Sequence, residues 1–369
     1  MSETANPAML VVLGGFVLAF IFGAVANKTN FCTMGAISDV VNMGHWGRIR
    51  MWLLAIAVAV IGTNLLYYFE LIDLSKSLYY RTTLPWLSLL LGGAIFGVGM
   101  TIASGCANKN LVRLGGGSVR SLVVLVFGAI SAYMTLKGLF GQWRSSYLDP
   151  ISIDLGVLGL SNQSLGHLIA KISGASDKAA LLIAGGAVSA GLLLFVLKDK
   201  RFRANTSHVI GSTVLGLLIV MAWYLTGHIG FGENPETLET VYFATNTRTL
   251  ESFSFVAPTA FSLELLMLWT DKSLHMTFGI ATVAGIVLGS FAYAASTRQF
   301  RWEGFASVDD LRTHLIGAVL MGFGGVTAIG CTIGQGLSGV STLSLGSCVA
   351  LAGIVGGATA MMKWQAWRA

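Results

Sequence analysis

The chain has 369 residues, of which 54% are hydrophobic and only 11% are charged. Charged residues make up about 25% of an average soluble domain, so this composition excludes one and indicates a protein of the lipid bilayer. The formal net charge of +6 suggests nucleic-acid binding, but the basic residues lie in the loops between apolar runs and form no single face. We therefore predict an all-α polytopic membrane protein that binds no nucleic acid.

Apolar runs, taken in chain order, predict nine membrane-spanning helices, each long enough to cross a hydrocarbon core about 30 Å thick. They are expected at 9–26, 51–69, 85–103, 119–139, 179–197, 209–226, 275–296, 311–328 and 343–362. Four segments are too short to span and predict re-entrant or broken helices, at 29–42, 107–114, 253–269 and 332–340. The pairs Gly93/Gly97 and Gly353/Gly357, each spaced by four residues, predict close contacts between helices.

The distribution of Lys and Arg predicts the orientation of these spans. With the N-terminus outside, the cytoplasmic loops hold 15 of the 23 basic residues, and the outer segments hold 12 of the 17 acidic ones. The positive-inside rule counts only Lys and Arg, and it favours this arrangement. Residues 1–7 lack the basic region of a cleaved signal, so we expect the first apolar run to stay as a span.

Two glycine-rich stretches repeat at a shift of 225 residues (331 minus 106), and each ends on a Gly-Cys pair. Gly92, Gly97, Gly99 and Gly105, which precede Cys106, match Gly317, Gly322, Gly324 and Gly330, which precede Cys331. The two cysteine spans enter the membrane from opposite sides, so the repeat is inverted, with halves at 1–140 and 204–369 and a connector with a basic turn at 141–203. Inverted repeats with broken helices place a binding site near the middle of the bilayer.

The residues around the two Gly-Cys pairs favour a small sulfur-bearing anion. Each cysteine can precede a short helix whose first N–H groups attract an anion, and Gly105 and Gly330 let the backbone approach it closely. A thiol is soft and polarizable, which suits a sulfur atom better than a hard oxyanion. Further donors near the site are Asn108, Asn110, Thr332 and Gln335. Lys109 fits two interpretations, an interfacial anchor or a cation of the pathway.

Other chemistries lack their sequence signals. There is no Gly-x4-Gly-Lys-Ser/Thr loop for ATP hydrolysis, no Cys-x-x-Cys for dithiol exchange and no Cys/His cluster for zinc. We therefore predict a protein that is not an enzyme and that has no cofactor and no metal site. Cys348 stands in the middle of a span without a Gly-Cys context, and we interpret it as a small buried hydrophobic residue.

Three cysteine motifs in order resemble the YeeE/YedE family of bacterial membrane proteins over nearly the whole chain. They are Phe31-Cys32-Thr33-Met34-Gly35 with Asp39, Gly105-Cys106, and Gly330-Cys331-Thr332-Ile333-Gly334-Gln335. The resemblance implies thiosulfate uptake across the inner membrane, nine spans in a pseudo-twofold hourglass, and a central route in which Cys32, Cys106 and Cys331 contact the substrate's sulfur. The periplasmic N-terminus and cytoplasmic C-terminus predicted above fit this location.

The resemblance also leaves points open. The family often has glycine where this chain has Lys109, and the extra cation can alter which anion is preferred. Another sulfur or selenium species is an alternative substrate, and a thiol relay that hands sulfur to a cytoplasmic protein is an alternative mechanism. Some members pair with a TusA-like sulfurtransferase. Because this chain ends directly after its last span, we expect such a partner to be a separate protein.

Overall fold

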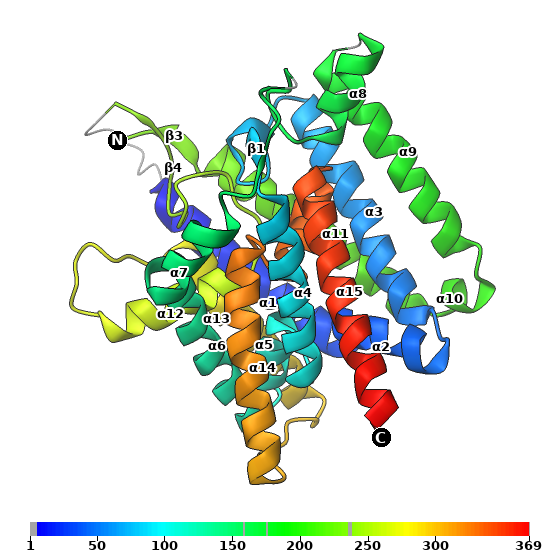
Figure 1. Ribbon diagram of the computed structural model, residues 1–369, viewed down its shortest axis with the longest axis vertical. Coiled ribbons are helices and arrows are strands. Elements are labelled where there is room, and N and C mark those ends of the chain that lie inside the picture. The colour runs from blue at the N-terminus through cyan, green and yellow to red at the C-terminus, as the bar shows by residue number, and fades with distance from the viewer. Residues whose placement is uncertain (1–5, 158, 175, 235–237, 369) are drawn as a thin grey trace.

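A computed structural model describes residues 6–157, 159–174, 176–234 and 238–368. The described chain is a bundle of long helices, with short helices enclosed among them and small loop elements at one end (Figure 1). Its long helices are α1 (Pro7–Thr29), α3 (Gly47–Tyr68), α4 (Trp86–Ile102), α6 (Val119–Lys137), α9 (Asp177–Leu197), α11 (Thr206–Tyr224), α13 (Phe278–Ser296), α14 (Val308–Thr327) and α15 (Leu345–Arg368). These nine helices occupy the nine predicted spans, so the all-α polytopic fold is confirmed.

Eight of these helices, some continued by a neighbouring short one, are long and apolar enough to cross a membrane among the described residues. The ninth, α14, is 20 residues long but carries Asp309, Asp310 and Arg312 near its start. It packs against both α4 and α6, so its apolar part lies inside the bundle with the others.

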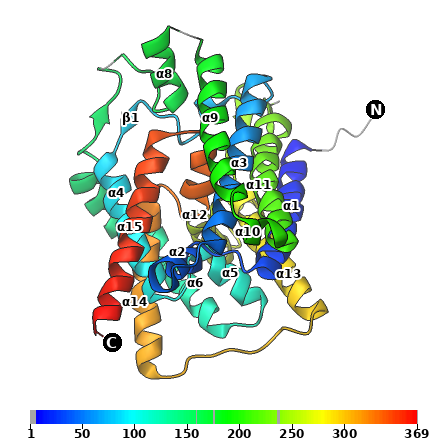
Figure 2. The ribbon, with the colours of Figure 1, turned by 90° about the vertical axis from the view of Figure 1, so that its right-hand side faces the viewer.

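The four short segments are also helical. They are α2 (Thr33–Met43), α5 (Ala107–Gly115), α12 (Val256–Met267) and the π-helix η4 (Gly334–Gly339). In Figures 1 and 2, α2 and α5 lie in the half of the bundle that contains the C-terminus, while the start of α1 lies at the opposite end. The prediction of short broken helices at these places is confirmed. The fourth segment, η4, has the i→i+5 hydrogen bonds of a π-helix.

The sequence did not predict the elements in the loops. The additional helices are η1 (Leu74–Lys76), α7 (Leu139–Trp143), η2 (Arg144–Leu148), α8 (Leu165–Ser173), α10 (Lys200–Ala204) and η3 (Leu225–Ile229). The strands are β1 (Thr83–Leu84), β2 (Ile153–Asp154), β3 (Phe231–Glu233) and β4 (Thr240–Tyr242). They form two antiparallel pairs, with Thr83 opposite Asp154 and Phe231 opposite Tyr242.

The glycine pairs predicted as contact faces lie between α4 and α15. A side chain at Gly97 or Gly357 would overlap the backbone of the other helix, at Ile354 and Ala94 respectively. Gly93 and Gly353 make equivalent contacts with the backbone at Ala350 and Leu90. Small residues thus allow the two backbones to touch, which is how helices gain packing energy in lipid.

The packing partners follow a regular pattern. Helix α1 packs on α13 as α11 packs on α3, and α4 packs on α15 as α14 packs on α6. The short helices follow the same pattern: α5 packs on α13 as η4 packs on α3, and α12 packs on α6 as α2 packs on α15. Swapping the first four long helices for the last four reproduces these pairs, as an inverted repeat requires. The division at residues 140 and 203 stays a prediction.

Candidate functional site

Each of the three motif cysteines follows the same backbone turn. The helix before it ends with a residue in the left-handed conformation two positions ahead of the cysteine: Asn30 at φ 54°, Ser104 at φ 56° and Ile329 at φ 56°. The next N–H then bonds five residues back, from Phe31 to Ala26, from Gly105 to Met100 and from Gly330 to Gly325. This is the Schellman arrangement of helix ends. It reverses the chain inside the bundle and delivers a cysteine at the start of a new short helix.

The thiols of Cys32 and Cys331 accept hydrogen bonds from the helices that they precede. Gly35 N donates to Cys32 Sγ at 3.3 Å, and Gly334 N donates to Cys331 Sγ at 3.4 Å. Cys106 is the N-cap residue of α5 in an extended conformation. The prediction of a short helix directly after Cys106 therefore agrees with the structure, and a helix also begins directly after Cys32, whereas the one after Cys331 begins only at Gly334.

The three turns converge at one place. The Cys106 side chain interacts with the Cys32 thiol and with the Thr332 hydroxyl group, which adjoins Cys331. All three cysteines are free and buried, and Cys106 and Cys331 have no exposed surface. Two turns from the first part of the chain thus bring the Cys32 and Cys106 thiols together in the interior, and the third turn adds Thr332, the neighbour of Cys331.

A cavity approaches this cluster from each side. The larger, about 900 Å³, is lined by Cys32, Lys109 and Arg113 together with the start of α3 and the turn before α10; we call it the basic chamber. The smaller, about 470 Å³, ends at Gly330, beside Cys331; we call it the outer chamber because the predicted orientation places it outside. Cys32 lines the basic chamber and Gly330 lines the outer one, while neither lining includes the fully buried Cys106 or Cys331.

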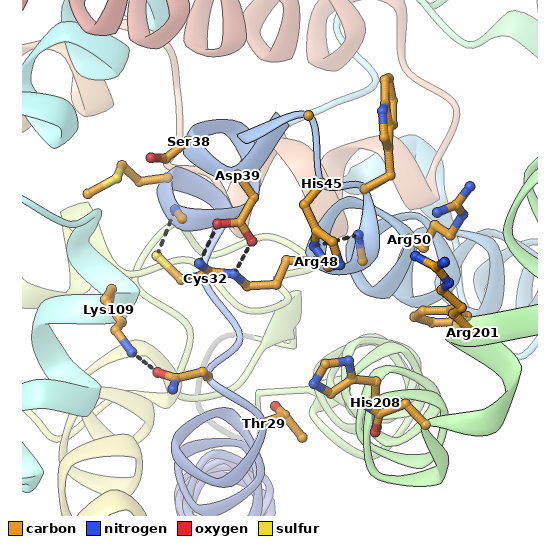
Figure 3. A pocket seen from close by; sticks show the side chains of 18 of the residues that line it. Thr29, Cys32, Ser38, Asp39, His45, Arg48, Arg50, Lys109, Arg201 and His208 are labelled. Atoms are coloured by element: carbon orange, nitrogen blue, oxygen red, sulfur yellow. Dashed lines mark hydrogen bonds and ion pairs between the residues drawn. The ribbon is translucent and has the colours of Figure 1, made fainter. Parts of the chain in front are cut away.

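The basic chamber carries an excess of cations. Its cationic side chains are Arg48, Arg50, Lys109, Arg113 and Arg201, against the two acids Asp39 and Asp199. Arg48 pairs with Asp39, and Arg50 pairs with Asp199. Lys109 Nζ donates to Asn30 Oδ1 at 2.8 Å, and Arg113 Nη1 donates to the Ser104 carbonyl at 2.7 Å. Two cations thus contact the turns that precede Cys32 and Cys106, and Figure 3 shows Lys109 beside the first of them.

The outer chamber has a more neutral lining. Arg144 Nε donates to Asp149 at 3.1 Å, while Arg81 has no acidic partner among the described residues. Burial raises the pKa of the Glu251 carboxyl group above its ordinary value of 4.5, although Thr247 opposes this shift by donating its N–H at 2.7 Å. The described segment before α12 contributes Ser252 and Ser254 to this lining, in the half that lacks a third cysteine turn.

The predicted donors divide into two groups. Asn110 Nδ2 bonds the carbonyls of Gly105 and Cys106, so it supports the turn and is not free for a ligand. Gln335 Nε2 donates to the Ala328 carbonyl at 2.6 Å, which is the matching role in the second turn. Asn108 Oδ1 and Gln335 Oε1 are buried without a hydrogen-bond partner among the described residues, and the buried Thr332 hydroxyl group lies beside the Cys106 thiol. A buried polar atom without a partner is costly, which marks these positions as ligand candidates.

The structure also corrects and extends the sequence interpretation. Cys348 is exposed on α15, so the expectation of a buried hydrophobic residue is wrong. Lys109 lines the basic chamber, which favours the pathway interpretation over the interfacial one. Arg48 was missed as a site residue. Its signal was the acid Asp39 in a short apolar helix, because a buried carboxylate requires a partner.

The sequence profile of the sulphur transport family matches residues 28–360, most of the chain. The chain belongs to the sulphur transport family. Two curated relatives are named thiosulfate transporter TsuA. One, from Escherichia coli (strain K12), is 26% identical over 374 aligned residues that cover 97% of this chain and 90% of the relative. The other, from Spirochaeta thermophila, is 26% identical over 341 residues, with 91% and 93% coverage.

Membership of the sulphur transport family confirms the resemblance found from the three cysteine motifs. The matched range begins just before Cys32 and ends within α15, so it includes all three turns and both chambers. A transporter of a sulfur compound requires a route that ends at both faces of the membrane. The basic chamber reaches Cys32, and the outer chamber reaches Gly330, the residue before Cys331.

Proposed function

We propose that this protein carries thiosulfate across the bacterial inner membrane, through the thiol cluster between the two chambers. The observation that supports this most strongly is the convergence of three cysteine turns on one buried point, with a cavity on each side. The names of the two relatives specify thiosulfate. A soft thiol contacts the terminal sulfur of this anion better than it contacts an oxygen.

The central residues have distinct roles in this proposal. Cys32, Cys106 and Cys331 contact the terminal sulfur in turn, and Gly105 and Gly330 admit it close to the backbone. Asn108, Thr332 and Gln335 offer further polar contacts to the ion, and the free N–H groups of the short helices offset part of its charge. Lys109 then holds the ion at the basic chamber. No covalent bond is made or broken, so the protein acts as a transporter and not as an enzyme.

The orientation and the partner belong to the same proposal. The excess of Lys and Arg in the predicted cytoplasmic loops supports a periplasmic N-terminus and a cytoplasmic C-terminus. The basic chamber then opens to the cytoplasm. We propose a TusA-like sulfurtransferase as a separate partner on that side, on the strength of the family resemblance, and co-purification from a host that makes both proteins tests this pairing.

Uptake of labelled thiosulfate into proteoliposomes tests the proposed function. Preparations labelled with ³⁵S in either the terminal or the central sulfur should accumulate label equally in vesicles that contain the protein. Accumulation of the terminal label alone would favour a thiol relay, in which only that atom passes on. If neither label accumulates, thiosulfate transport is refuted. Labelled sulfite or selenite would then test the alternative substrates.

A further inference from the structure

The ion pair between Asp39 and Arg48 holds a guanidinium group in a fixed position in the basic chamber. Arg48 Nε donates to Asp39 Oδ2 at 2.5 Å, and Arg48 Nη2 donates to Asp39 Oδ1 at 2.6 Å. This is the bidentate geometry that a planar guanidinium forms with a carboxylate. Asp39 is almost fully buried in α2, whereas about a third of the Arg48 side chain is exposed. The acid therefore anchors the cation at the chamber wall.

The third nitrogen of this guanidinium remains available. Arg48 Nη1 has no acceptor among the residues that the structure describes, and it is not enclosed. It lies directly over Gly35, where any side chain would overlap it. A Cβ atom built at Gly35 would also be 3.6 Å from Cys32 Cβ. Gly35 thus permits the Arg48 donor to sit beside the first turn of α2, the turn that Cys32 caps.

The surroundings of this donor suit an oxyanion. Lys109 lies near both Cys32 and Arg48, so two cations flank the thiol on the chamber side (Figure 3). Thiosulfate has one soft sulfur end and one end with three oxygens. A thiol next to a guanidinium edge matches these two ends, because Arg donors bind oxyanions in a directed way and the thiol contacts the sulfur.

We propose that Arg48, anchored by Asp39 and admitted by Gly35, is the oxyanion-recognition residue of the basic chamber. It binds the oxygen-bearing end of the ion while Cys32 contacts the sulfur end. This inference rests on the proposed function for the identity of the substrate. It adds a specificity that the thiols alone do not provide, since it discriminates by the oxygens and not by the sulfur.

Binding of ³⁵S-thiosulfate to the purified full chain, with unlabelled sulfate as competitor, tests this role. A hydrogen bond to a charged group contributes about 1.5–3 kcal/mol, so Arg48→Gln should weaken both thiosulfate and sulfate by about tenfold or more. Arg48→Lys should fall between Arg48→Gln and the wild type. Cys32→Ala should weaken thiosulfate only. Unchanged binding of both anions by Arg48→Gln would overturn the proposal.

Arg50 offers a matched control. It stands two residues further along α3, lines the same chamber and is also paired with an acid, Asp199. Figure 3 places it well away from Cys32, and its guanidinium packs over the Phe195 ring. Arg50→Gln should therefore change the two affinities by less than about twofold. An equal loss in Arg50→Gln and Arg48→Gln would mean that general chamber charge, and not Arg48, holds the anion.

A charge-swapped variant separates recognition from a structural role of the ion pair. Asp39→Arg combined with Arg48→Asp keeps an ion pair between α2 and α3 but removes the cation from its place beside Gly35. It should recover the thermal stability that Asp39→Asn loses, yet bind both anions as weakly as Arg48→Gln. Recovery of binding along with stability would reduce the pair to a structural link and refute the proposal.

The two proposals fail in different ways. If the wild type takes up no thiosulfate, the proposed function is wrong, but the dependence of sulfate binding on Arg48 still decides the present inference. If uptake is normal and Arg48→Gln binds sulfate like the wild type, the inference is wrong and the proposed function stands.

Discussion

At the scale of single residues, the site combines polarizable thiols with positively charged side chains. Cys106 and Cys331 are fully buried, whereas Lys109, Arg113 and Arg48 line the basic chamber and not the outer one. A dianion loses several kcal/mol or more of solvation when it enters a low-dielectric region, and a helix N-terminus returns only about half a unit of positive charge. The cations therefore add to the positive charge of the helix N-termini and offset more of the solvation energy that the dianion loses.

We predict that loss of a central thiol stops transport and leaves the fold intact. Cys106→Ala and Cys331→Ala should each lower thiosulfate uptake by about tenfold or more, because a hydrogen bond to an ion contributes about 1.5–3 kcal/mol. Cys32→Ala should have a smaller effect, since the second half has no third cysteine turn. Uptake and detergent-stable yield are measured together. Cys348→Ala, on the exposed face of α15, is the control, and normal uptake by Cys106→Ala would disprove the role.

A second prediction concerns Lys109. Lys109→Ala should raise the half-saturation concentration for uptake several-fold, by removing a cation that contacts the turn before Cys32. Lys109→Glu should be worse, because its charge repels the ion. Uptake as a function of thiosulfate concentration in proteoliposomes measures both. Equal effects of Ala and Glu would show that Lys109 acts through packing and not through its charge.

The third prediction concerns pH and Glu251 in the outer chamber. Burial raises the pKa of this carboxyl group above its ordinary 4.5, so the folded protein binds the proton more tightly than the unfolded chain does. The resulting stabilisation is complete below pH 4.5 and is lost as pH rises through the raised pKa. The thermal midpoint should therefore fall with rising pH in that range, and Glu251→Gln should reduce this fall. An unchanged slope in Glu251→Gln would contradict the assignment.

At the scale of elements, the fold depends on close packing between helices that contain glycine. Gly356 and Gly357 are neighbours on α15, but only Gly357 touches α4, while nothing lies within 4 Å of a side chain built at Gly356. The pair therefore separates helix contact from helix propensity. Both positions have the same intrinsic cost of glycine in a helix, so a difference between them reports packing alone.

We predict that Gly357→Leu destabilises the protein and that Gly356→Leu does not. Overpacking a close contact costs about 1–3 kcal/mol or more, and at Gly357 the obstacle is backbone, which cannot move aside. Thermal denaturation of the detergent-purified variants, read by loss of the monodisperse peak, measures this difference. Similar midpoints for the two variants would show that the α4–α15 contact is not as close as the structure has it.

At the scale of the whole molecule, the orientation follows from charge. A reporter active only in the cytoplasm should work when fused after Arg203 or Ala369 and should fail near Glu236; Glu236 and Ala369 lie outside the described residues. The basic turn around α10 supports the first placement, because Lys and Arg are retained on the cytoplasmic side. The opposite reporter pattern would invert the orientation and place the basic chamber outside.

The sequence was sufficient for the spans, the short helices and the repeat. Apolar length predicts a span almost directly, and the Gly-Cys pairs recur with their context, which is why Cys106 and Cys331 could be found; Cys32 was found through the family resemblance. The outer strands and short loop helices were missed because they are held by contacts and not by local pattern. Arg48 was missed because its role depends on Asp39 and Gly35 lying on a neighbouring helix. The Schellman turns were missed because Ile329 is not a residue that predicts a left-handed conformation.

The first half of the chain has two cysteine turns and the second half has one, so one cysteine turn has no counterpart in the other half. Where the first half has Cys32, the described second half has Phe255 at the start of α12, and the cations likewise gather on one side. Equal electrochemical potentials of the ion on the two sides still give no net flow, whatever the shape of the path. The two faces nevertheless saturate differently: the face with the cations fills at the lower concentration. With the proposed substrate and orientation, we expect import to slow through product occupancy as thiosulfate accumulates inside, so that the internal pool limits further entry.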